Sequence, residues 1–504
     1  MKILFRTDAS AQIGTGHVMR CCTLAEALLE SGAQIRFVSR HLPSSLEKML
    51  REKGFELSLL GDEEPDGELD AYSVPHAHWL GASQMADAKA TLRVIDGDKQ
   101  DWVVVDHYAL DASWERQLRQ GAKNIMVIDD LADRKHDCDL LLDQNFYHDQ
   151  ESRYLNLVPK TCQMLLGPGY ALLRKEFAKQ RVNARVRTGE VKQALVFFGG
   201  VDLHDYTTQT ILALSELENT NFAVDVVIGA EHANRAGISD LCKKFGYQLH
   251  VQSTKMAELM SMADLAIGAG GGAVWERACM MLPTLSIPIA ENQVMQLADL
   301  AKAGILYTFD TEKFTREAIK RHGFALIENH SLRYLLSSNS ALLVDGRGAE
   351  KVAKRLSLVS SITIREATLS DENDLFLWRN HPSIRNISFN KNEISSEQHA
   401  NWFKGILASE SNLLLIGEYE GRSVGVVRFD VVDTVAEVSI YLIQKSENKG
   451  MGLSLLQSAE LWLKKNKKHI RAIKASVIES NDISHRFFIR AGFQPVSRSY
   501  RKEL

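Results

Sequence analysis

The stretch KILFRTDASAQIGTGHVMRCCTLAEALLESG, residues 2–32, decides the fold class. It begins with a short apolar run, passes through a loop with two glycines, and continues with the pattern of a helix. A strand followed at once by a helix is the unit from which parallel sheets covered by helices are built. The stretch therefore predicts an α/β fold for the start of the chain.

Two series of short apolar runs extend this pattern to about residue 355. The first series lies within residues 2–144 and consists of the runs KILFRT, QIRFVS, WVVVDH, NIMVIDD and CDLLLDQ. The second lies within residues 193–288 and consists of QALVFFGG, VDVVIGA, ADLAIGAG and LPTLSIP. The polar, basic segment 177–193 lies between them. We therefore predict two Rossmann-like halves, residues 1–180 and 190–357, with a ligand site between them at the carboxyl ends of their strands.

A different pattern begins near residue 361. The runs NLLLIGEYEGRSVGVVRFD and AEVSIYLI follow each other at hairpin spacing, and a helical segment and a last strand complete the module. We predict a separate α+β domain over residues 362–504.

Composition limits the function classes. The 504 residues are 45% hydrophobic and 25% charged, which is typical of a soluble protein, and no apolar run approaches the roughly 18 residues of a membrane span. The N-terminal apolar run is too short for a signal peptide, so we predict a cytoplasmic protein. The net charge of −4 argues against a nucleic-acid partner, and the six cysteines lack zinc-site spacing, so we expect no metal.

The first glycine loop raises the question of what His17 does. Gly14 and Gly16 allow a ligand to approach the backbone, but Met19 stands where a dinucleotide-binding loop has its third glycine. His17 opens the helix, where the helix dipole favours a neutral imidazole that can accept a proton. The alternative is a histidine that only donates to a phosphate.

Other polar residues follow strands of the same half. Any one of them could equally be a helix cap or a loop salt bridge. They are Asp8, Asp106, His107, Tyr108, Asp129 and Asp130.

The second glycine loop lies in ADLAIGAGGGAVWERACMMLPTLSIPIAENQ, residues 263–293. Backbone amides at Gly270, Gly271 and Gly272 could hold a diphosphate, and Glu276, one turn into the helix, could accept from ribose hydroxyls. The alternative for Glu276 is a solvated helix charge.

This strand, glycine loop, glutamate and ENQ arrangement resembles UDP-sugar enzymes of the GT-B type related to the MurG glycosyltransferase. The blocks around GTGH, VVDHYALD, IDDLADR and LLGPGYALLR resemble a narrower family, the UDP-2,4-diacetamido-2,4,6-trideoxy-β-L-altropyranose hydrolases of pseudaminic acid biosynthesis. The resemblance covers residues 1–355.

The resemblance implies that His17 activates water to attack the anomeric carbon with inversion. UDP is stable as an anion, so its departure needs electrostatic neutralisation and no general acid. Asp8 and the residues of both glycine loops would bind the UDP-sugar with Glu276. Tyr108, Asn292 and Gln293 are candidates to orient sugar or water.

The C-terminal region carries a third glycine loop. Gly450 and Gly452 precede a helical pattern, and SVIESNDISHRFFIRAGFQPV follows with Asn481 and an aromatic pair. Together these residues resemble the GNAT acetyltransferases, and WRNHPSIR, SFN and HANWF are similar to the branch that acetylates sugar nucleotides. The resemblance implies acetyl-CoA as co-substrate, bound by Lys449, Gly450, Met451, Gly452, Asn481 and Phe488.

Two departures from the GNAT pattern matter. Glu447 replaces the usual first residue of the glycine loop, and Phe488 replaces a frequent tyrosine acid. Glu437 is a candidate base for the acceptor amine, and its alternative is a surface carboxylate.

The resemblances together imply a bifunctional enzyme of two consecutive steps. The C-terminal domain would acetylate the 4-amino group of a UDP-sugar, and the N-terminal region would then hydrolyse UDP from the product. The alternatives are a glycosyltransferase fused to an acetyltransferase, and a UDP-sugar-binding module without catalysis.

Overall fold

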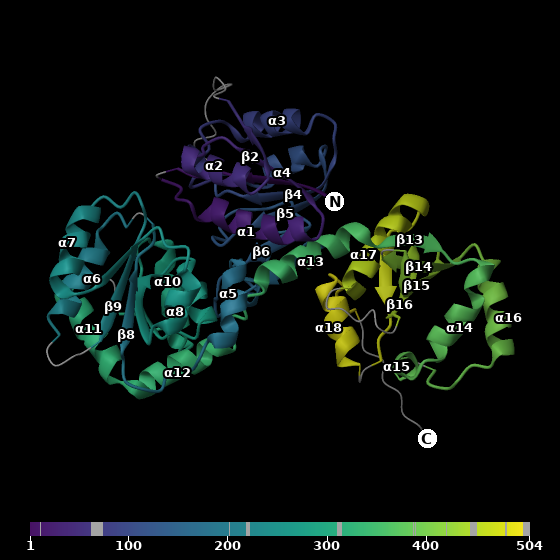
Figure 1. The fold of residues 1–504 in the computed structure, drawn as a ribbon. Coiled ribbons are helices and arrows are strands. Elements are labelled where there is room, and N and C mark those ends of the chain that lie inside the picture. Colours follow the sequence, from purple (N-terminus) through teal and green to yellow (C-terminus); the bar gives the residue numbers. More distant parts are fainter. Residues whose placement is uncertain are drawn as a thin grey trace. The chain divides into compact units, whose positions relative to one another are not determined.

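The computed structural model describes the chain except for residues 11, 62–73, 201, 218–221, 310–314, 387, 389, 420, 444–450, 479–480 and 497–504. The chain divides into two compact units, Met1–Ala353 and Lys354–Leu504. Figure 1 labels their helices and strands.

The first unit begins with a seven-stranded parallel sheet of order β3-β2-β1-β4-β5-β6-β7. Its strands are β1 (Lys2–Thr7), β2 (Gln34–Ser39), β3 (Glu56–Leu59), β4 (Gln100–Asp106), β5 (Ala122–Ile128), β6 (Leu140–Asp143) and β7 (Gln163–Leu166). The helices of this half are α1 (Gly16–Glu30), α2 (Ser44–Glu52), α3 (Gln84–Ile95) and α4 (Ala112–Leu118). The central strands are buried, as expected for a parallel sheet covered on both faces.

The second half of this unit repeats the plan with five parallel strands in the order β10-β9-β8-β11-β12. They are β8 (Gln193–Phe197), β9 (Ala223–Ile228), β10 (Gln248–Val251), β11 (Leu265–Ala269) and β12 (Thr284–Ile287). The helices are α6 (Tyr206–Ser215), α7 (Arg235–Phe245), α8 (Met256–Met262), α9 (Ala273–Cys279), α10 (Asn292–Lys302), α11 (Arg316–Glu328) and α12 (His330–Ala341). The helix α13 (Gly348–Ser361) begins in this unit and ends in the second.

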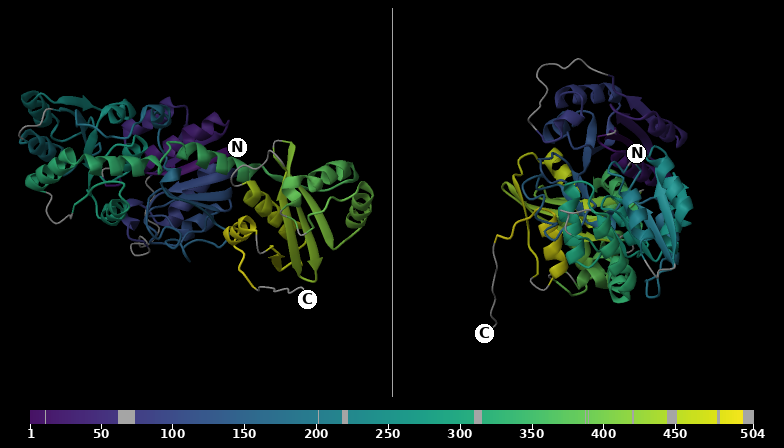
Figure 2. Two further views of the ribbon diagram at one scale, coloured as in Figure 1. Left: turned by 90° about the horizontal axis from the view of Figure 1, so that it is seen from below. Right: turned by 90° about the vertical axis from the view of Figure 1, so that its left-hand side faces the viewer.

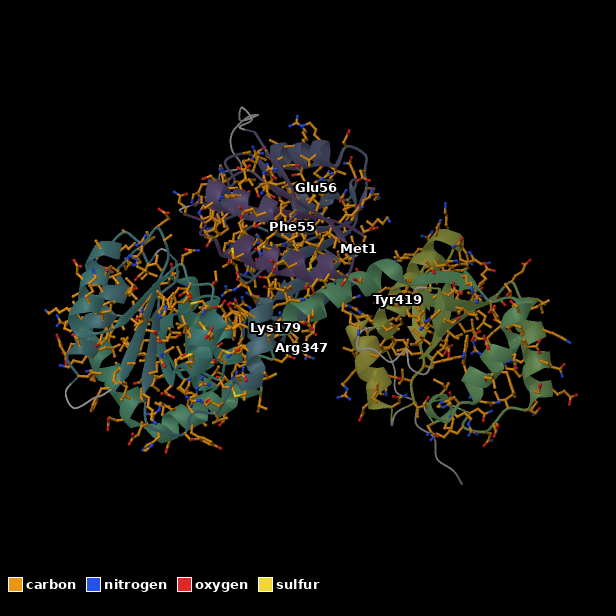
Figure 3. All side chains as sticks on the ribbon, viewed as in Figure 1. Met1, Phe55, Glu56, Lys179, Arg347 and Tyr419 are labelled. Carbon is orange, nitrogen blue, oxygen red and sulfur yellow. The ribbon has the colours of Figure 1, made fainter. Side chains whose placement is uncertain are left out.

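The segment that joins the halves is partly helical, with α5 (Lys175–Gln180) at its start. α5 packs close to the chain that leads into α13, and Figure 3 labels Lys179 and Arg347 there. A side chain at Gly348 would lie 2.1 Å from the carbonyl oxygen of Ala171, so only glycine fits this close approach.

The second unit is a five-stranded sheet of order β13-β14-β15-β16-β17, antiparallel except for the parallel β16–β17 pair. The strands are β13 (Thr363–Glu366), β14 (Asn412–Tyr419), β15 (Arg422–Val432), β16 (Val435–Leu442) and β17 (Ala472–Ala475). The helices are α14 (Glu372–Asn380), α15 (Pro382–Arg385), α16 (Ser396–Leu407), α17 (Met451–Asn466) and α18 (Asp482–Arg490). α17 lies on one side of the sheet and α14 and α16 on the other, as both figures show (Figures 1 and 2).

All six cysteines are free and buried. Across the described ranges, none of the helices has the length and apolar character that a membrane crossing requires.

Candidate active site

The first candidate site lies where the strand order of the first sheet reverses. β1 and β4 are neighbours, with Thr7 paired to Asp106, while the next strands along the chain lie on opposite sides of them. In open α/β sheets, ligands bind at this switch point, beyond the carboxyl ends of the strands. α1 begins at Gly16 directly after β1, so His17 meets Asp106, the last residue of β4.

His17 forms a buried pair with Asp106. Its Nδ1 lies 2.5 Å from Oδ1 of Asp106, and its side chain is 9% exposed. Arg20, one turn further along α1, donates through Nε to Oδ2 of Asp106 at 2.6 Å and through Nη2 to Oδ1 at 2.7 Å. The carboxylate thus holds the imidazole by one nitrogen and is itself held in place by a bidentate arginine.

Arg20 and His17 keep the carboxylate of Asp106 negatively charged. Burial alone would raise the pKa of its carboxyl group, but the charges and hydrogen bonds of Arg20 and His17 outweigh burial, and the pKa lies below its usual range. Asp106 therefore stays ionised and can accept a hydrogen bond from Nδ1–H of His17.

Tyr108 packs edge-on against the His17 ring, with ring centroids 4.6 Å apart. Its hydroxyl donates to Oδ1 of Asp130 at 2.5 Å, and Arg20 donates to Oδ2 of the same carboxylate at 3.0 Å. Burial, followed by the charge of Asp130, raises the pKa of Tyr108 well above its ordinary value. Tyr108 is therefore a neutral hydroxyl beside His17. The partly buried ring of Trp79 lies 5.8 Å from the Tyr108 ring.

Sequence reasoning missed Arg20 and did not single out Asp106 as the partner of His17. The spacing of His17 and Arg20, three residues apart, would have placed them on one helix face. Asp106 was only one of several strand-end carboxylates, and nothing local in the sequence ranks these groups.

Asp8 and Asp129 are buried and engaged with protein groups. Asp8 accepts from both terminal nitrogens of Arg6, at 2.6 and 3.1 Å, and from the backbone amide of Arg40. Asp129 pairs with Arg134 at 2.8 Å. Asp8 is fully buried and both of its oxygens have protein partners, so the structure does not support it as a substrate contact.

His107 is also inside the protein. Its Nδ1 accepts from the amide of Ala109 at 3.1 Å, and its Nε2 lies 3.2 Å from Asp8. Burial lowers its pKa. His107 is therefore enclosed by protein groups and presents no exposed face to a ligand.

The second glycine loop lies at the corresponding switch point of the second sheet, because β8 and β11 are neighbours there. The loop follows β11 and leads directly into α9. A side chain at Gly270 would lie 2.6 Å from Cδ1 of Leu297 and 3.0 Å from Oε1 of Gln293, both on α10. Gly270 is therefore required by close packing, whereas Gly272 has open space around it.

Glu276 lies on α9 with 17% of its side chain exposed, and Arg174 donates to its Oε1 at 3.2 Å. Burial raises its pKa, while Arg174 acts in the opposite direction. Oε1 of Gln293 accepts from the amide of Ile289 at 3.0 Å. Asn292 begins α10, but its side chain lies outside the described part of the chain.

The loop after β6 connects the two candidate regions. Oδ1 of Asn145 accepts from Nε1 of Trp275 on α9 at 3.2 Å and from Nε2 of Gln296 on α10 at 2.9 Å. Tyr147, two residues further, donates to the carbonyl oxygen of Asp130 at 3.3 Å. One loop therefore contacts both the glycine-loop helices and the segment that holds Tyr108.

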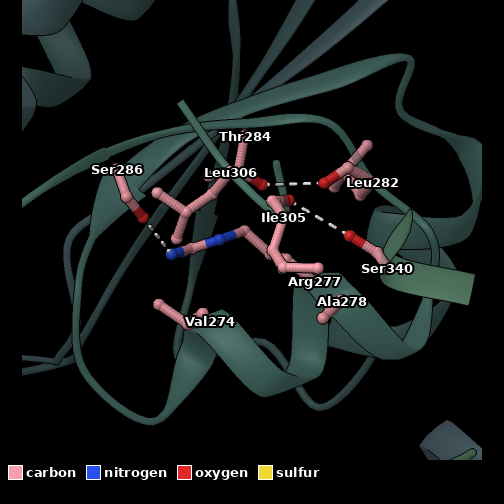
Figure 4. A pocket seen from close by; sticks show the side chains of 9 residues that line it. All are labelled: Val274, Arg277, Ala278, Leu282, Thr284, Ser286, Ile305, Leu306 and Ser340. Atoms are coloured by element: carbon pink, nitrogen blue, oxygen red, sulfur yellow. Dashed lines mark hydrogen bonds between the residues drawn. The ribbon is translucent and has the colours of Figure 1, made fainter. Parts of the chain in front are cut away.

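Arg277, on the helix α9 that follows the second glycine loop, lines a small cavity (Figure 4). Nη2 of Arg277 donates to the carbonyl oxygen of Ala269 at 2.5 Å and to Oγ of Ser286 at 3.1 Å. Burial lowers the pKa of this guanidinium to about 10. Arg277 ties the last residue of β11 to β12 and so fixes the strand end from which the loop starts.

Asp202, Asp205 and His232 bring possible ligand atoms within 4.8 Å of one another. Each of the three residues already accepts a hydrogen bond from a backbone amide. Asp202 and Asp205 accept from amides at the start of α6, and Nδ1 of His232 accepts from the amide of Asn234. We assign no metal to this cluster, and the expectation that the protein needs none stays a prediction.

The predicted acetyl-CoA residues of the second unit fall into two groups. Lys449 and Gly450 lie outside the described residues. Met451 and Gly452 begin α17, as a ligand-binding helix start requires. Asn481 caps α18 by accepting from the amide of Ser484 at 3.0 Å, and Phe488 packs edge-on against Phe487 and Phe493.

Glu437 lies on β16 with both oxygens occupied. Ser476 donates to Oε1 at 2.6 Å, and Lys474 lies 3.0 Å from Oε2. These two contacts lower its pKa. A carboxylate with a lowered pKa is a weaker base, so this geometry gives Glu437 no support as an amine base.

Comparison with known proteins adds three findings. Residues 364–502 match the family model described as acetyltransferase (GNAT) domain. A Campylobacter jejuni protein named UDP-2,4-diacetamido-2,4,6-trideoxy-beta-L-altropyranose hydrolase is 26% identical over 307 residues, which cover 60% of this chain and 97% of that protein. An uncharacterized protein of Methanocaldococcus jannaschii is 22% identical over 535 residues, which cover 100% of this chain and 99% of its own length.

Among solved structures, Acinetobacter baumannii MurG superimposes with a TM-score of 0.50 at 15% identity, covering 71% of this chain and 99% of MurG. At this identity the likeness shows the fold alone. Together with the parallel sheets of the first unit and the family match of residues 364–502, it confirms the predicted fold class of two Rossmann-like halves followed by a GNAT domain. The chain thus joins a region of the GT-B fold, with relatives named as UDP-sugar hydrolases, to a segment that matches the GNAT acetyltransferase family.

Proposed function

We propose that the first unit hydrolyses a UDP-activated amino sugar, with His17 as the base. The observation that carries this proposal is the buried His17–Asp106–Arg20 arrangement at the switch point of the first sheet. We infer the substrate, UDP-2,4-diacetamido-2,4,6-trideoxy-β-L-altropyranose, from the name of the Campylobacter jejuni relative.

The proposed chemistry needs one base and one water. Asp106 accepts a hydrogen bond from Nδ1–H of His17, which leaves the Nε2 lone pair free to take a proton from water. The water oxygen attacks the anomeric carbon from the side opposite the diphosphate. The bond between the anomeric carbon and the phosphate oxygen breaks, and its electron pair stays on UDP. The products are UDP and the free sugar with inverted configuration. Tyr108, beside the His17 ring, would orient the water or the sugar.

UDP would be held by the second half. The amide of Gly270 donates to the carbonyl oxygen of Ile287 at 3.0 Å, so the amides of Gly271 and Gly272 would face the diphosphate at the start of α9. Glu276 would accept from the ribose. Gly14 and Gly16 would leave room for the sugar beside His17. Asn292 and Gln293 are further candidates for sugar contacts.

We also propose that the second unit acetylates the 4-amino group of the precursor UDP-sugar. The match of residues 364–502 to the GNAT domain supports acetyl-CoA as the donor. The amine nitrogen attacks the thioester carbonyl, the carbon–sulfur bond breaks, and CoA leaves as a thiolate while the amine loses a proton. The amides at the start of α17, with Lys449 and Gly450, would hold the CoA diphosphate.

The MurG fold also suits a second function, transfer of the sugar to an acceptor. The two functions differ in whether an acceptor is required. UDP and a reducing sugar formed without any acceptor would exclude the transferase.

One assay tests both activities. The purified protein is incubated with acetyl-CoA and the UDP-4-amino sugar, and CoA thiol and free UDP are followed over time. We expect UDP to appear only when acetyl-CoA is present. CoA formation without UDP, together with no UDP release from the synthetic diacetamido UDP-sugar, would contradict the hydrolase assignment and the role of His17.

A further inference from the structure

Three arginines gather on one face of the second unit's sheet. Arg379 lies at the end of α14, Arg385 ends the short helix α15, and Arg428 lies on β15. All three side chains are half-buried. Nη1 of Arg379, Nε of Arg385 and Nε of Arg428 are shielded from solvent and have no hydrogen-bond partner within the described residues.

Acidic groups compensate this cluster only in part. Nη2 of Arg428 pairs with Asp430 at 2.8 Å, and Nη1 of Arg385 lies 3.8 Å from the exposed carboxylate of Glu393. Arg379 donates through Nη2 to the carbonyl oxygen of Asn390 at 2.8 Å. Each guanidinium therefore keeps donors that its protein partners do not use.

The three charges act on one another. Burial, together with the charges of Arg385 and Arg428, lowers the pKa of Arg379, while the nearby Tyr441 acts in the opposite direction. The charges of Arg379 and Arg428 both act to lower the pKa of Tyr441, so both guanidinium groups lie near its hydroxyl. Holding like charges together costs free energy unless an anion is bound between them.

The cluster lies on the sheet face turned away from α17. Val426 pairs with Tyr441 across β15 and β16, and both pack with Trp378 in the core beneath α14 and α16. Arg428 is two residues from Val426 along the strand and so shares its face. Val427, on the other face, packs in the core that includes α17. The predicted CoA site at the start of α17 is therefore on the opposite side of the sheet.

We propose that Arg379, Arg385 and Arg428 form a subsite for the diphosphate of the nucleotide-sugar acceptor. This inference rests on the proposed acetyltransferase function and names how that unit recognises its acceptor. Guanidinium groups match phosphate oxygens in planar, bidentate geometry, and two phosphates supply enough oxygens for three such groups. The donor's phosphates are assigned to the other face, which leaves the acceptor's diphosphate as the occupant.

The binding test uses the full chain and UDP as the probe, measured by isothermal titration calorimetry. We expect two UDP sites in the wild type, one in each unit. Arg428→Gln should weaken one of them by about 10-fold or more, since each lost charge-assisted hydrogen bond costs that much. Inorganic pyrophosphate should compete at this site and uridine should not. Arg422→Gln, which removes an exposed arginine of the same strand, is the matched control.

Thermal melting checks that each variant folds. If Arg428→Gln does not fold, the same binding measurement is made with Arg385→Gln, on the short helix α15. UDP binding in both variants equal to that of the wild type overturns the subsite. Displacement of this UDP by saturating CoA, with a raised KM for acetyl-CoA in the variants, also overturns it, because the cluster would then serve the donor.

Kinetic measurements distinguish a failure of the proposed subsite from a failure of the proposed function. With the UDP-4-amino sugar, Arg428→Gln should raise the KM for the sugar by about 10-fold or more and leave the KM for acetyl-CoA unchanged. If the wild type releases no CoA from acetyl-CoA with any UDP-amino sugar as acceptor, the proposed function is contradicted. The loss of a UDP site in the variants would then still establish a nucleotide diphosphate subsite.

Discussion

At the scale of single residues, the pairing of His17 with Asp106 makes a specific claim about catalysis. Asp106→Asn keeps the size of the side chain but removes the charge that orients and supports the imidazole. We expect kcat for UDP release to fall by about 100-fold or more. The measurement is steady-state UDP release from the diacetamido UDP-sugar.

The chain offers a matched control for this substitution. Glu115 and His136 form a second buried carboxylate–histidine pair, with Nδ1 of His136 2.7 Å from Oε1 of Glu115. Glu115→Gln should lower stability and leave kcat for UDP release close to that of the wild type. Equal losses of kcat in both variants would mean that Asp106 acts only through folding.

Asp143 makes stability depend on pH. Burial raises its pKa to about 7, and Asp130 adds to the rise, while the amide of Asn145 and Arg153 oppose it. In the unfolded chain this carboxyl group titrates near pH 4, so between about pH 4 and 7 the folded state binds the extra proton and stability falls as pH rises. The slope contributed is at most about 1.4 kcal/mol per pH unit.

Asp143→Asn should remove this contribution. The stability of the variant minus that of the wild type, measured by urea unfolding, is therefore expected to rise from pH 5 to pH 7. Other titrating groups cancel in this difference. A difference that stays constant with pH would show that Asp143 ionises normally in the folded protein.

At the scale of elements, the second glycine loop depends on the distance between β11 and α10. Gly270→Ala would place a methyl group 2.6 Å from Cδ1 of Leu297 and 3.0 Å from Oε1 of Gln293, so these two side chains of α10 must shift. We expect a loss of about 1–3 kcal/mol in the free energy of unfolding, as for other overpacked sites. Gly272→Ala meets nothing within 4 Å and should leave stability nearly unchanged. Thermal melting of both variants decides the matter, and equal melting temperatures would contradict this account of the loop.

The elements also show what the sequence could predict. The central strands of both sheets were predicted, because strands covered on both faces have continuous apolar runs. The strands β3, β7 and β10 were missed. All three lie at sheet edges, and β3 and β10 expose much of their length, so they lack the apolar signal of central strands.

The candidate site was predictable to the same limited extent. The glycine loops and His17 stand out because their composition is unusual next to strand ends. The partners Arg20, Asp106 and Arg174 could not be ranked, because long-range pairing decides which charged residues meet. The arginine cluster of the second unit was missed for the same reason, since its members come from three elements that are separate in the sequence.

At the scale of the whole molecule, the two activities should be separable by single substitutions. His17→Ala removes the proposed base, so UDP release should fall by at least about 100-fold while CoA release is unchanged. Arg428→Gln should weaken acetylation of the UDP-4-amino sugar and leave hydrolysis of the already acetylated UDP-sugar unchanged. Loss of both activities in either variant would contradict the assignment of one reaction to each unit.

The order of the two reactions follows from how each unit would recognise its substrate. If the acetyltransferase holds its acceptor by the diphosphate, the sugar freed by hydrolysis has lost the group by which it is bound. We therefore expect the free 4-amino sugar to be a poor acetyl acceptor, by about 100-fold or more in kcat/KM relative to its UDP form, because several charge-assisted hydrogen bonds are lost together. The measurement is CoA thiol release with each acceptor. Equal kcat/KM values would show that acetylation does not depend on the nucleotide, and the reaction order would then have to be set by the specificity of the hydrolase for the acetylated sugar.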